Sequence, residues 1–112
     1  MFDTAQDGIL LIDPLARKIM DANPSAVSLL GTSLDALLGR ELWEVGLLKD
    51  EPSSHAVFRE LQKQGSVRLS ILLKDADTNA GERPIEFLGN IYLEEGCEVI
   101  QCNLRDIGPR AD

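Results

Sequence analysis

The stretch that decides the fold is Gly8-Ile9-Leu10-Leu11-Ile12-Asp13, near the start of the 112-residue chain. Its four consecutive apolar residues begin and end with a β-branched side chain, which is typical of a strand buried on both faces. Such a strand lies inside a sheet. Asp13-Pro14 then predicts a turn, and residues 18–21 predict a short second strand that returns alongside the first.

After the second strand the apolar residues repeat with a helical period. Asn23-Pro24 predicts an N-cap and a first-turn proline, and Gly31 ends this first helix. A second short helix is predicted to begin near Thr32 or Ser33 and to end at Gly39. The residues expected to face inward from this second helix are Leu34, Leu37 and Leu38.

A longer helix is predicted further along the chain. Residues 41–45 add one more turn, and a helix follows from about Ser54 to Gln64, with Ser53 as its N-cap and Gly65 as its end. Its expected inner face consists of Val57, Phe58 and Leu61.

The remainder of the chain is predicted to be β. Apolar and polar residues alternate over residues 67–74, 85–94 and 97–106, with a long polar connection at 75–84 and a tight turn at Glu95-Gly96. Two strands, then short helices, then three strands in a meander indicate the α+β class: an antiparallel sheet with its helices on one face.

Composition narrows the function. Hydrophobic residues at 44% and charged residues at 27% indicate one globular domain over residues 1–112. The net charge of −8 would repel phosphates, so we expect no nucleic acid and no membrane contact. The start of the chain does not resemble a signal peptide, and two cysteines are too few for a disulfide scaffold. These features predict a cytoplasmic domain.

Four ordered strings carry a resemblance to a known family: residues 7–13 (DGILLID), 21–26 (DANPSA), 37–44 (LLGRELWE) and 99–107 (VIQCNLRDI). Together they resemble a PAS domain over nearly the whole chain. The resemblance implies a five-stranded antiparallel sheet with short helices packed on one face. The chain departs from the family pattern at Gly108, which stands where Thr is usual after Asp-Ile, and Pro109 follows.

The resemblance implies a sensory and dimerisation input domain of a bacterial signal-transduction protein, with a sensor histidine kinase as the expected parent. Changes caused by a ligand or a partner would pass through the signal exit Arg105, Asp106 and Ile107 to an effector domain of the same chain. The alternative is a small-molecule or haem-binding domain that regulates a diguanylate cyclase or another effector. The fragment itself has no catalytic triad or phosphate-binding loop, so we do not expect it to be an enzyme.

A ligand would lie in the concavity between the sheet and the helices. Two readings remain open, because the same residues can fill this space themselves or can surround a small molecule. An indole needs a partner for its N–H when it is buried, so Trp43 is of particular interest. The candidate pocket residues are Ile12, Val27, Leu30, Leu38, Trp43, Phe58, Leu69, Phe87 and Cys102.

No tightly bound cofactor is expected. Similarity to flavin-binding members would require a cysteine soon after Gly39-Arg40, where this chain has Glu41-Leu42-Trp43. His55 is the single histidine and a candidate haem ligand, although an ordinary surface histidine is the simpler reading. We expect no metal site: the acidic run at 75–79 superficially fits a calcium loop, but Ala80 stands where that loop needs glycine.

Self-association is the expected interaction. The late strands carry apolar side chains on their otherwise polar phase, and such residues suit a homodimer seam better than a solvated face. They can also be isolated surface residues, which are common. The candidate dimer face consists of Leu72, Leu88, Tyr92 and Val99.

Overall fold

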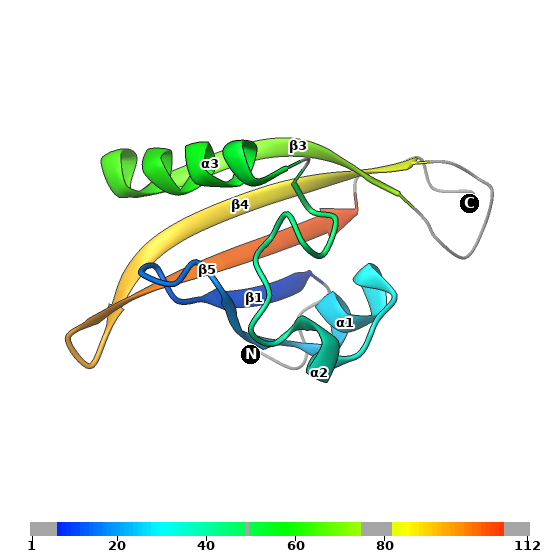
Figure 1. Ribbon diagram of the computed structural model, residues 1–112, viewed down its shortest axis with the longest axis horizontal. Coiled ribbons are helices and arrows are strands. Elements are labelled where there is room, and N and C mark those ends of the chain that lie inside the picture. The colour runs from blue at the N-terminus through cyan, green and yellow to red at the C-terminus, as the bar shows by residue number, and fades with distance from the viewer. Residues whose placement is uncertain (1–6, 49, 75–81, 107–112) are drawn as a thin grey trace.

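A computed structural model describes residues 7–48, 50–74 and 82–106 of the chain. The strands form a five-stranded antiparallel sheet in the order β2-β1-β5-β4-β3, with the helices beside it (Figure 1). This confirms the predicted α+β class. The elements are β1 (Gly8–Ile12), β2 (Ile19–Ala22), α1 (Pro24–Leu30), α2 (Leu34–Leu37), α3 (Glu51–Gln64), β3 (Ser66–Lys74), β4 (Glu82–Glu94) and β5 (Cys97–Asp106).

The last strand occupies the middle of the sheet. β5 pairs with β1 on one side, where Leu10 lies opposite Cys102, and with β4 on the other, where Phe87 lies opposite Leu104. The predicted interior position of the first strand is therefore confirmed, because β1 lies between β2 and β5. The tight turn at Glu95-Gly96 is also confirmed, since both residues adopt a positive φ.

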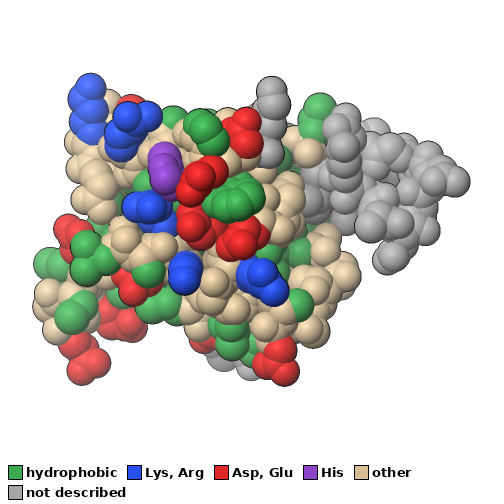
Figure 2. All heavy atoms as spheres, in the orientation of Figure 1, with side chains coloured by type: hydrophobic (Ala, Val, Ile, Leu, Met, Phe, Trp, Pro, Cys, Tyr) green, Lys and Arg blue, Asp and Glu red, His purple; other side chains and the backbone are tan. Residues whose placement is uncertain are grey.

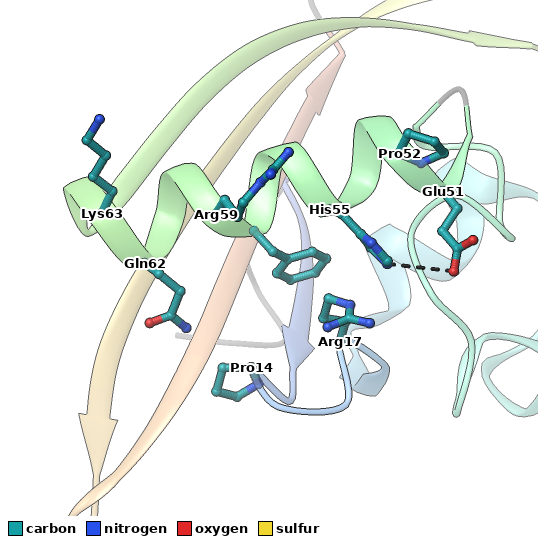
Figure 3. Close-up of a pocket in the computed structure, with 9 residues that line it drawn as sticks. Pro14, Arg17, Glu51, Pro52, His55, Arg59, Gln62 and Lys63 are labelled. Atoms are coloured by element: carbon teal, nitrogen blue, oxygen red, sulfur yellow. Dashed lines mark ion pairs between the residues drawn. The ribbon is translucent and has the colours of Figure 1, made fainter.

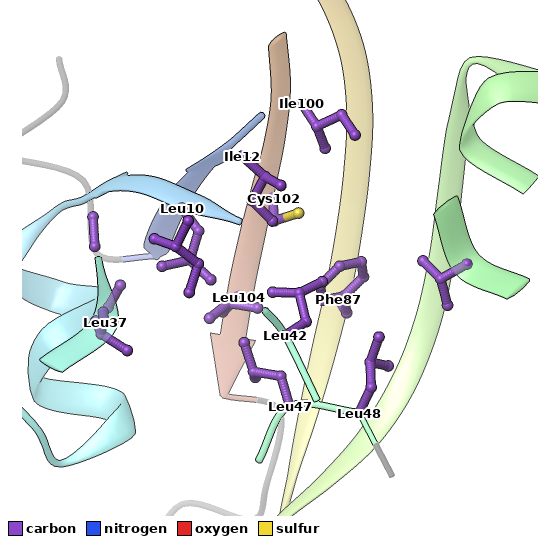
Figure 4. Close-up of a cluster of buried hydrophobic side chains, with 14 of the residues drawn as sticks. Leu10, Ile12, Leu37, Leu42, Leu47, Leu48, Phe87, Ile100, Cys102 and Leu104 are labelled. Atoms are coloured by element: carbon purple, nitrogen blue, oxygen red, sulfur yellow. The ribbon is translucent and has the colours of Figure 1, made fainter. Parts of the chain in front are cut away.

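One face of the sheet and the helices enclose the hydrophobic core. Because side chains alternate along a strand, every second residue of β1, β4 and β5 points to this face. Figure 4 shows side chains of the sheet and of the helical segment packed together. The core residues with essentially no exposed surface include Leu10, Ile12, Leu37, Leu42, Leu47, Leu61, Ile85, Phe87, Ile100, Cys102 and Leu104.

The N-cap of α1 also ties that helix to the sheet. The Asn23 Oδ1 atom accepts hydrogen bonds from the N–H of Ala26 at 2.9 Å and of Ile9 at 2.8 Å. The Asn23 side-chain amide donates to the carbonyl oxygen of Asp7 at 3.1 Å. The approach is close: a Cβ atom on Gly8 would lie 2.9 Å from the Cα atom of Ala26. The predicted cap is confirmed, and it additionally fixes α1 against β1.

The second helix is shorter than predicted. It spans one turn, with the side chain of Ser33 as its N-cap, and it ends before Leu38, which adopts an extended backbone. Leu38 therefore leaves the helix face and is 39% exposed, and Leu34 is 38% exposed. The prediction that these two residues face inward is wrong, while Leu37 is buried as predicted. The segment after it forms hydrogen-bonded turns rather than helix.

The third helix begins earlier than predicted. The Asp50 side chain, not that of Ser53, caps it, and it accepts a hydrogen bond from the N–H of Ser53 at 3.0 Å. Pro52 in the first turn is compatible with this start, because proline has no backbone N–H and the first turn of a helix does not need one. Gly65 ends α3 in the left-handed conformation, as predicted. Among the described residues, no helix has the length and apolar character needed to cross a membrane.

Candidate functional site

The predicted interior pocket is occupied at its centre by its own side chains. Ile12, Phe87 and Cys102 are completely buried members of the core, and Phe58 is nearly so. Leu38 does not belong to the predicted pocket, because it is exposed. The remaining candidates, which pack against the edge of the core while partly exposed, are Val27, Leu30, Trp43 and Leu69.

The two cysteines differ in chemistry. Burial raises the pKa of the Cys102 thiol, because the charged thiolate would be placed in an apolar surrounding. Cys97 is exposed, and both thiols are free. Cys102 is thus an inert core residue, as its position among apolar neighbours on β5 predicted.

Two polar side chains near the core lack hydrogen-bond partners among the described residues. The indole Nε1 atom of Trp43 and the hydroxyl oxygen of Ser54 are both shielded from solvent. Trp43 packs against the core and Ser54 lies on the buried side of α3. The partner that a buried indole N–H needs is therefore not found within the described part of the chain.

A cavity of about 760 Å³ lies elsewhere, between α3 and the loop of residues 13–18 that joins β1 to β2. We call it the α3 cavity. Figure 3 shows Pro14 and Arg17 of the loop on one side and His55 and Gln62 of α3 on the other. Only Phe58 of the predicted pocket residues lines it. The complete lining is Pro14, Arg17, Glu51, Pro52, His55, Phe58, Arg59, Gln62 and Lys63.

Two of the polar side chains that line the α3 cavity, Arg17 and His55, form long ion pairs. The Nε atom of Arg17 lies 3.9 Å from Glu41 Oε1, and the Nε2 atom of His55 lies 3.7 Å from Glu51 Oε2. Both distances exceed the length of a hydrogen bond. Neither nitrogen has a hydrogen-bond partner among the described residues, although both atoms are shielded from solvent.

A tight loop positions Arg17. Asp13 organises it: its side chain accepts a hydrogen bond from the N–H of Leu15 at 2.9 Å, and its carbonyl oxygen accepts one from the N–H of Arg17 at 2.7 Å. Arg17 itself has a φ of 60°, which is uncommon for a residue with a side chain. The Asp13-Pro14 turn was predicted, but its place across the cavity from α3 was not, because the two segments are far apart in sequence.

His55 faces this cavity instead of the core. Its side chain is 38% exposed and forms the Glu51 ion pair drawn in Figure 3. Among the described residues, no group of three or more potential metal ligands occurs. The acidic run at 75–79 lies outside the described residues.

The candidate dimer residues share the outer face, by which we mean the face of the sheet turned away from the helices. Tyr92 lies directly opposite Val99, whereas Leu88 lies opposite Asn103 and Leu72 opposite Pro84. Val99 is buried at 6% exposure, while Leu72 is 59% exposed. Val99 is therefore already covered within the chain, contrary to its predicted role as an exposed seam residue, whereas Leu72 is open to solvent.

The signal-exit residues lie where β5 ends. Arg105 Nε is 3.5 Å from Asp7 Oδ1, which links the exit to the residue before β1. Asp106 is the last residue of β5 and lies opposite Ile85. Ile107, with Gly108 and Pro109, lies outside the described residues.

Comparisons with known proteins agree with this architecture. A family model described as a PAS domain matches residues 1–64. The chain is similar to the PAS domain of an HTR-like protein from Haloarcula marismortui, with 20% identity, a TM-score of 0.78 and coverage of 95% of this chain and 85% of that one. No curated protein sequence matches the chain.

Two further solved structures show the same likeness. A domain of a sensory box sensor histidine kinase/response regulator from Geobacter sulfurreducens is 21% identical, with a TM-score of 0.76 and coverage of 94% of this chain and 87% of that one. The PAS domain of a protein from Colwellia psychrerythraea is 24% identical, with a TM-score of 0.74 and coverage of 97% and 92%. At these identities the structures establish the fold.

Proposed function

This chain belongs to the PAS domain family, a family of sensory modules, and we propose that it is the dimerising input domain of a bacterial sensor histidine kinase. The family assignment rests on a model that matches more than half of the chain. Support for a kinase parent comes from a solved structure of similar fold that is itself a domain of a sensor histidine kinase/response regulator. Catalysis would belong to the effector domain and not to this domain.

The observation that carries the proposal is the position of β5. This strand is the last element in the described part of the chain, and it lies in the middle of the sheet between β1 and β4. A change in sheet packing or twist therefore reaches the exit at Arg105 and Asp106 directly. The Arg105–Asp7 ion pair couples the start of the domain to the same point. Ile107 would continue this path into the effector domain.

A dimer on the outer face is the second part of the proposal. Tyr92 is partly exposed and lies opposite the apolar Val99, which gives this face an aromatic anchor of the kind enriched in interfaces. Leu88 and Leu72 would extend the contact along β4 and β3. A second copy of this chain would cover Tyr92, Leu88 and Leu72, whereas Val99 is already buried within the chain.

We further propose that the domain works in the cytoplasm without a tightly bound flavin or haem. The absence of a cysteine at residues 41–43 argues against flavin-adduct chemistry. The orientation of His55 toward the α3 cavity argues against haem ligation in the core. Two free cysteines, one of them exposed, are consistent with a reducing compartment.

Analytical ultracentrifugation of the purified chain tests the dimer. We expect Tyr92→Lys to convert a dimer to a monomer, because it places a charge at the centre of the seam. Leu93→Lys is the matched control: Leu93 is the neighbouring residue, it is 69% exposed, and the alternation of β4 turns it away from the outer face. A wild-type chain that remains monomeric at all concentrations, or a Tyr92→Lys chain that still dimerises, would contradict the proposed interface.

The parent is identified by the gene that encodes this chain. A histidine-phosphotransfer helix downstream of residue 112 would support the kinase. A Gly-Gly-Asp-Glu-Phe segment there would instead support the alternative, in which a small molecule bound by this domain regulates a diguanylate cyclase.

A further inference from the structure

We propose that the α3 cavity binds a small organic anion that carries carboxylate or phosphate groups on an apolar body. The site is distinct from the interior concavity, because Arg17 of the 13–18 loop and the outward side of α3 build it. The role of such a ligand as a signal rests on the proposed sensory function, whereas its binding to the cavity does not depend on that function.

The lining of the cavity holds more basic than acidic side chains, unlike the chain as a whole. The chain carries a net charge of −8, whereas the basic side chains of Arg17, Arg59 and Lys63 line the cavity together with His55 and one carboxylate, Glu51. The Glu41 carboxylate lies outside the lining, 3.9 Å from Arg17. Figure 2 shows basic side chains near the histidine on this face, with acidic side chains also beside it. A local concentration of cations on an acidic protein attracts small anions to one place while the overall field repels polyanions.

The basic residues of α3 are spaced to act together. Glu51, His55, Arg59 and Lys63 follow one another at intervals of four residues, which places them along one side of the helix. Arg17 approaches His55 from the loop (Figure 3). Among the described residues Arg59 and Lys63 form no ion pair, so both are available to an anion at the rim.

The existing ion pairs leave room for a better acceptor. The Arg17–Glu41 and His55–Glu51 distances of 3.9 and 3.7 Å are too long for hydrogen bonds. Both nitrogens are shielded and lack a hydrogen-bond partner among the described residues, an arrangement that is unusual in folded proteins. A carboxylate or phosphate of a ligand would give the two side chains the short, charge-assisted hydrogen bonds that the two glutamates do not give.

The apolar residues of the lining indicate which kind of ligand body would fit. The lining also includes the apolar side chains of Phe58, Pro14 and Pro52. The volume of about 760 Å³ suits a small organic molecule. An apolar or aromatic body against Phe58, with its acidic groups toward Arg17 and the rim, satisfies both parts of the lining.

A ligand in the α3 cavity would affect the signal exit through only two strands. The 13–18 loop leads directly from β1, and β1 pairs along its length with β5. A ligand that joins the loop to α3 would therefore bias the position of the strand beside the exit strand.

Phenyl phosphate and citrate are the probes for the purified chain, with benzyl alcohol as the uncharged control, at constant ionic strength. Isothermal titration calorimetry gives the affinity, and amide chemical shifts give the location. We expect both anions, and not benzyl alcohol, to shift the amides of Arg17, His55 and Arg59. Arg17→Gln should weaken binding about tenfold, the loss that corresponds to one charge-assisted hydrogen bond.

Three variants separate specific binding from a general charge effect. Arg59→Gln should weaken binding about threefold, since an exposed rim charge contributes less. Glu51→Gln should strengthen binding, because it removes the one carboxylate of the lining. Arg68→Gln, a basic residue on the outer face outside the cavity, should leave the affinity unchanged. Equal losses in Arg68→Gln and Arg59→Gln, weaker binding in Glu51→Gln, or shifts confined to other residues would overturn the proposal.

Lipid headgroups carry the same acidic chemistry as free anions, so sedimentation with phosphatidic acid vesicles forms a separate arm. We expect no cosedimentation of the acidic chain. Vesicle binding that depends on Arg17 would overturn the assignment to a free small molecule. Loss of the dimer in the Tyr92→Lys test would leave these titrations unaffected, so the two proposals can fail independently.

Discussion

The two sides of α3 differ in almost every physical property. The inner side carries Val57 and Leu61, which are buried in the hydrophobic core. The outer side carries His55, Arg59 and Lys63, which line the α3 cavity, and of these three His55 forms one long ion pair. A filled apolar surface determines stability, whereas a hollow charged surface contributes little to it and is free to recognise a ligand.

The two sides also differ in the space that they offer to a ligand. The centre of the interior is occupied by Phe87, Cys102 and their neighbours, so a ligand there would have to displace close-packed side chains. On the outer side, the space already exists. A ligand that binds between the 13–18 loop and α3 would change the relation of two elements without opening the core.

The largest expected difference between the two sides comes from adjacent residues of the helix. Leu61→Ala should lower the free energy of unfolding by about 2–5 kcal/mol, because it leaves a void beneath a completely buried side chain. Gln62→Ala, one residue later and facing the cavity, should change it by less than about 0.5 kcal/mol. Urea denaturation followed by circular dichroism measures both. Equal losses would show that the outer side is as much a part of the core as the inner side.

The contrast between buried and exposed positions can also be tested at the helix caps Asn23 and Ser33. Asn23→Ala should lower the free energy of unfolding by about 2–3 kcal/mol, because the N–H groups of Ile9 and Ala26 both lose their acceptor in a buried place. Ser33→Ala removes a similar cap from an exposed helix end, and we expect a loss of about 0.5–1 kcal/mol. The same denaturation experiment compares them. A loss in Ser33→Ala as large as that in Asn23→Ala would contradict the role assigned to burial.

Most of the fold could be predicted from local signals. The apolar run at 8–12, the Asn23-Pro24 cap and the alternation in the last strand each determine an element without distant contacts. The errors occur where a short segment has competing signals. Leu38 continues the apolar spacing of α2, but the helix stops after one turn and its backbone becomes extended. Ser53 is a good N-cap in sequence, but Asp50 is equally good and is the residue that caps α3.

The α3 cavity could be predicted less well. The i, i+4 spacing of His55, Arg59 and Lys63 is visible in the sequence, but such a stripe is usually a solvated helix face. The contribution of Arg17 depends on the fold bringing a loop from near the start of the chain against α3. Spacing along one helix contains no information on that contact. The pocket predicted from apolar residues coincides with the core, because core packing and ligand binding both use apolar side chains and the sequence does not distinguish them.

Burial of Cys102 should give a pH-dependent change in the free energy of unfolding, of intermediate size. The pKa of the Cys102 thiol is raised in the folded state, so the folded chain keeps its proton after the unfolded chain has lost it. Stability from this source is present below the pKa of the unfolded thiol and falls as the pH rises above it. Between about pH 8 and about pH 10 the wild type should lose about 2 kcal/mol more than Cys102→Ala does.

A thiol assay complements the pH series. With 5,5′-dithiobis(2-nitrobenzoate), the native chain should release one equivalent of chromophore, from the exposed Cys97, and the chain in urea should release two. Parallel pH curves for wild type and Cys102→Ala, or two rapid equivalents from the native chain, would show that the region around Cys102 opens to solvent.

The smallest expected effect on stability belongs to the outer side of α3. Arg59→Gln and Lys63→Gln should each change the free energy of unfolding by less than about 0.5 kcal/mol, since neither side chain forms an ion pair with another described residue and both are exposed. The same variants should nevertheless weaken the binding of phenyl phosphate. If either variant lowers stability as much as a core substitution does, the basic side of α3 supports the structure and is not reserved for a ligand. Unchanged stability together with weakened binding of phenyl phosphate would show that these basic side chains serve ligand recognition, because a substitution in a recognition surface lowers affinity without lowering the free energy of unfolding.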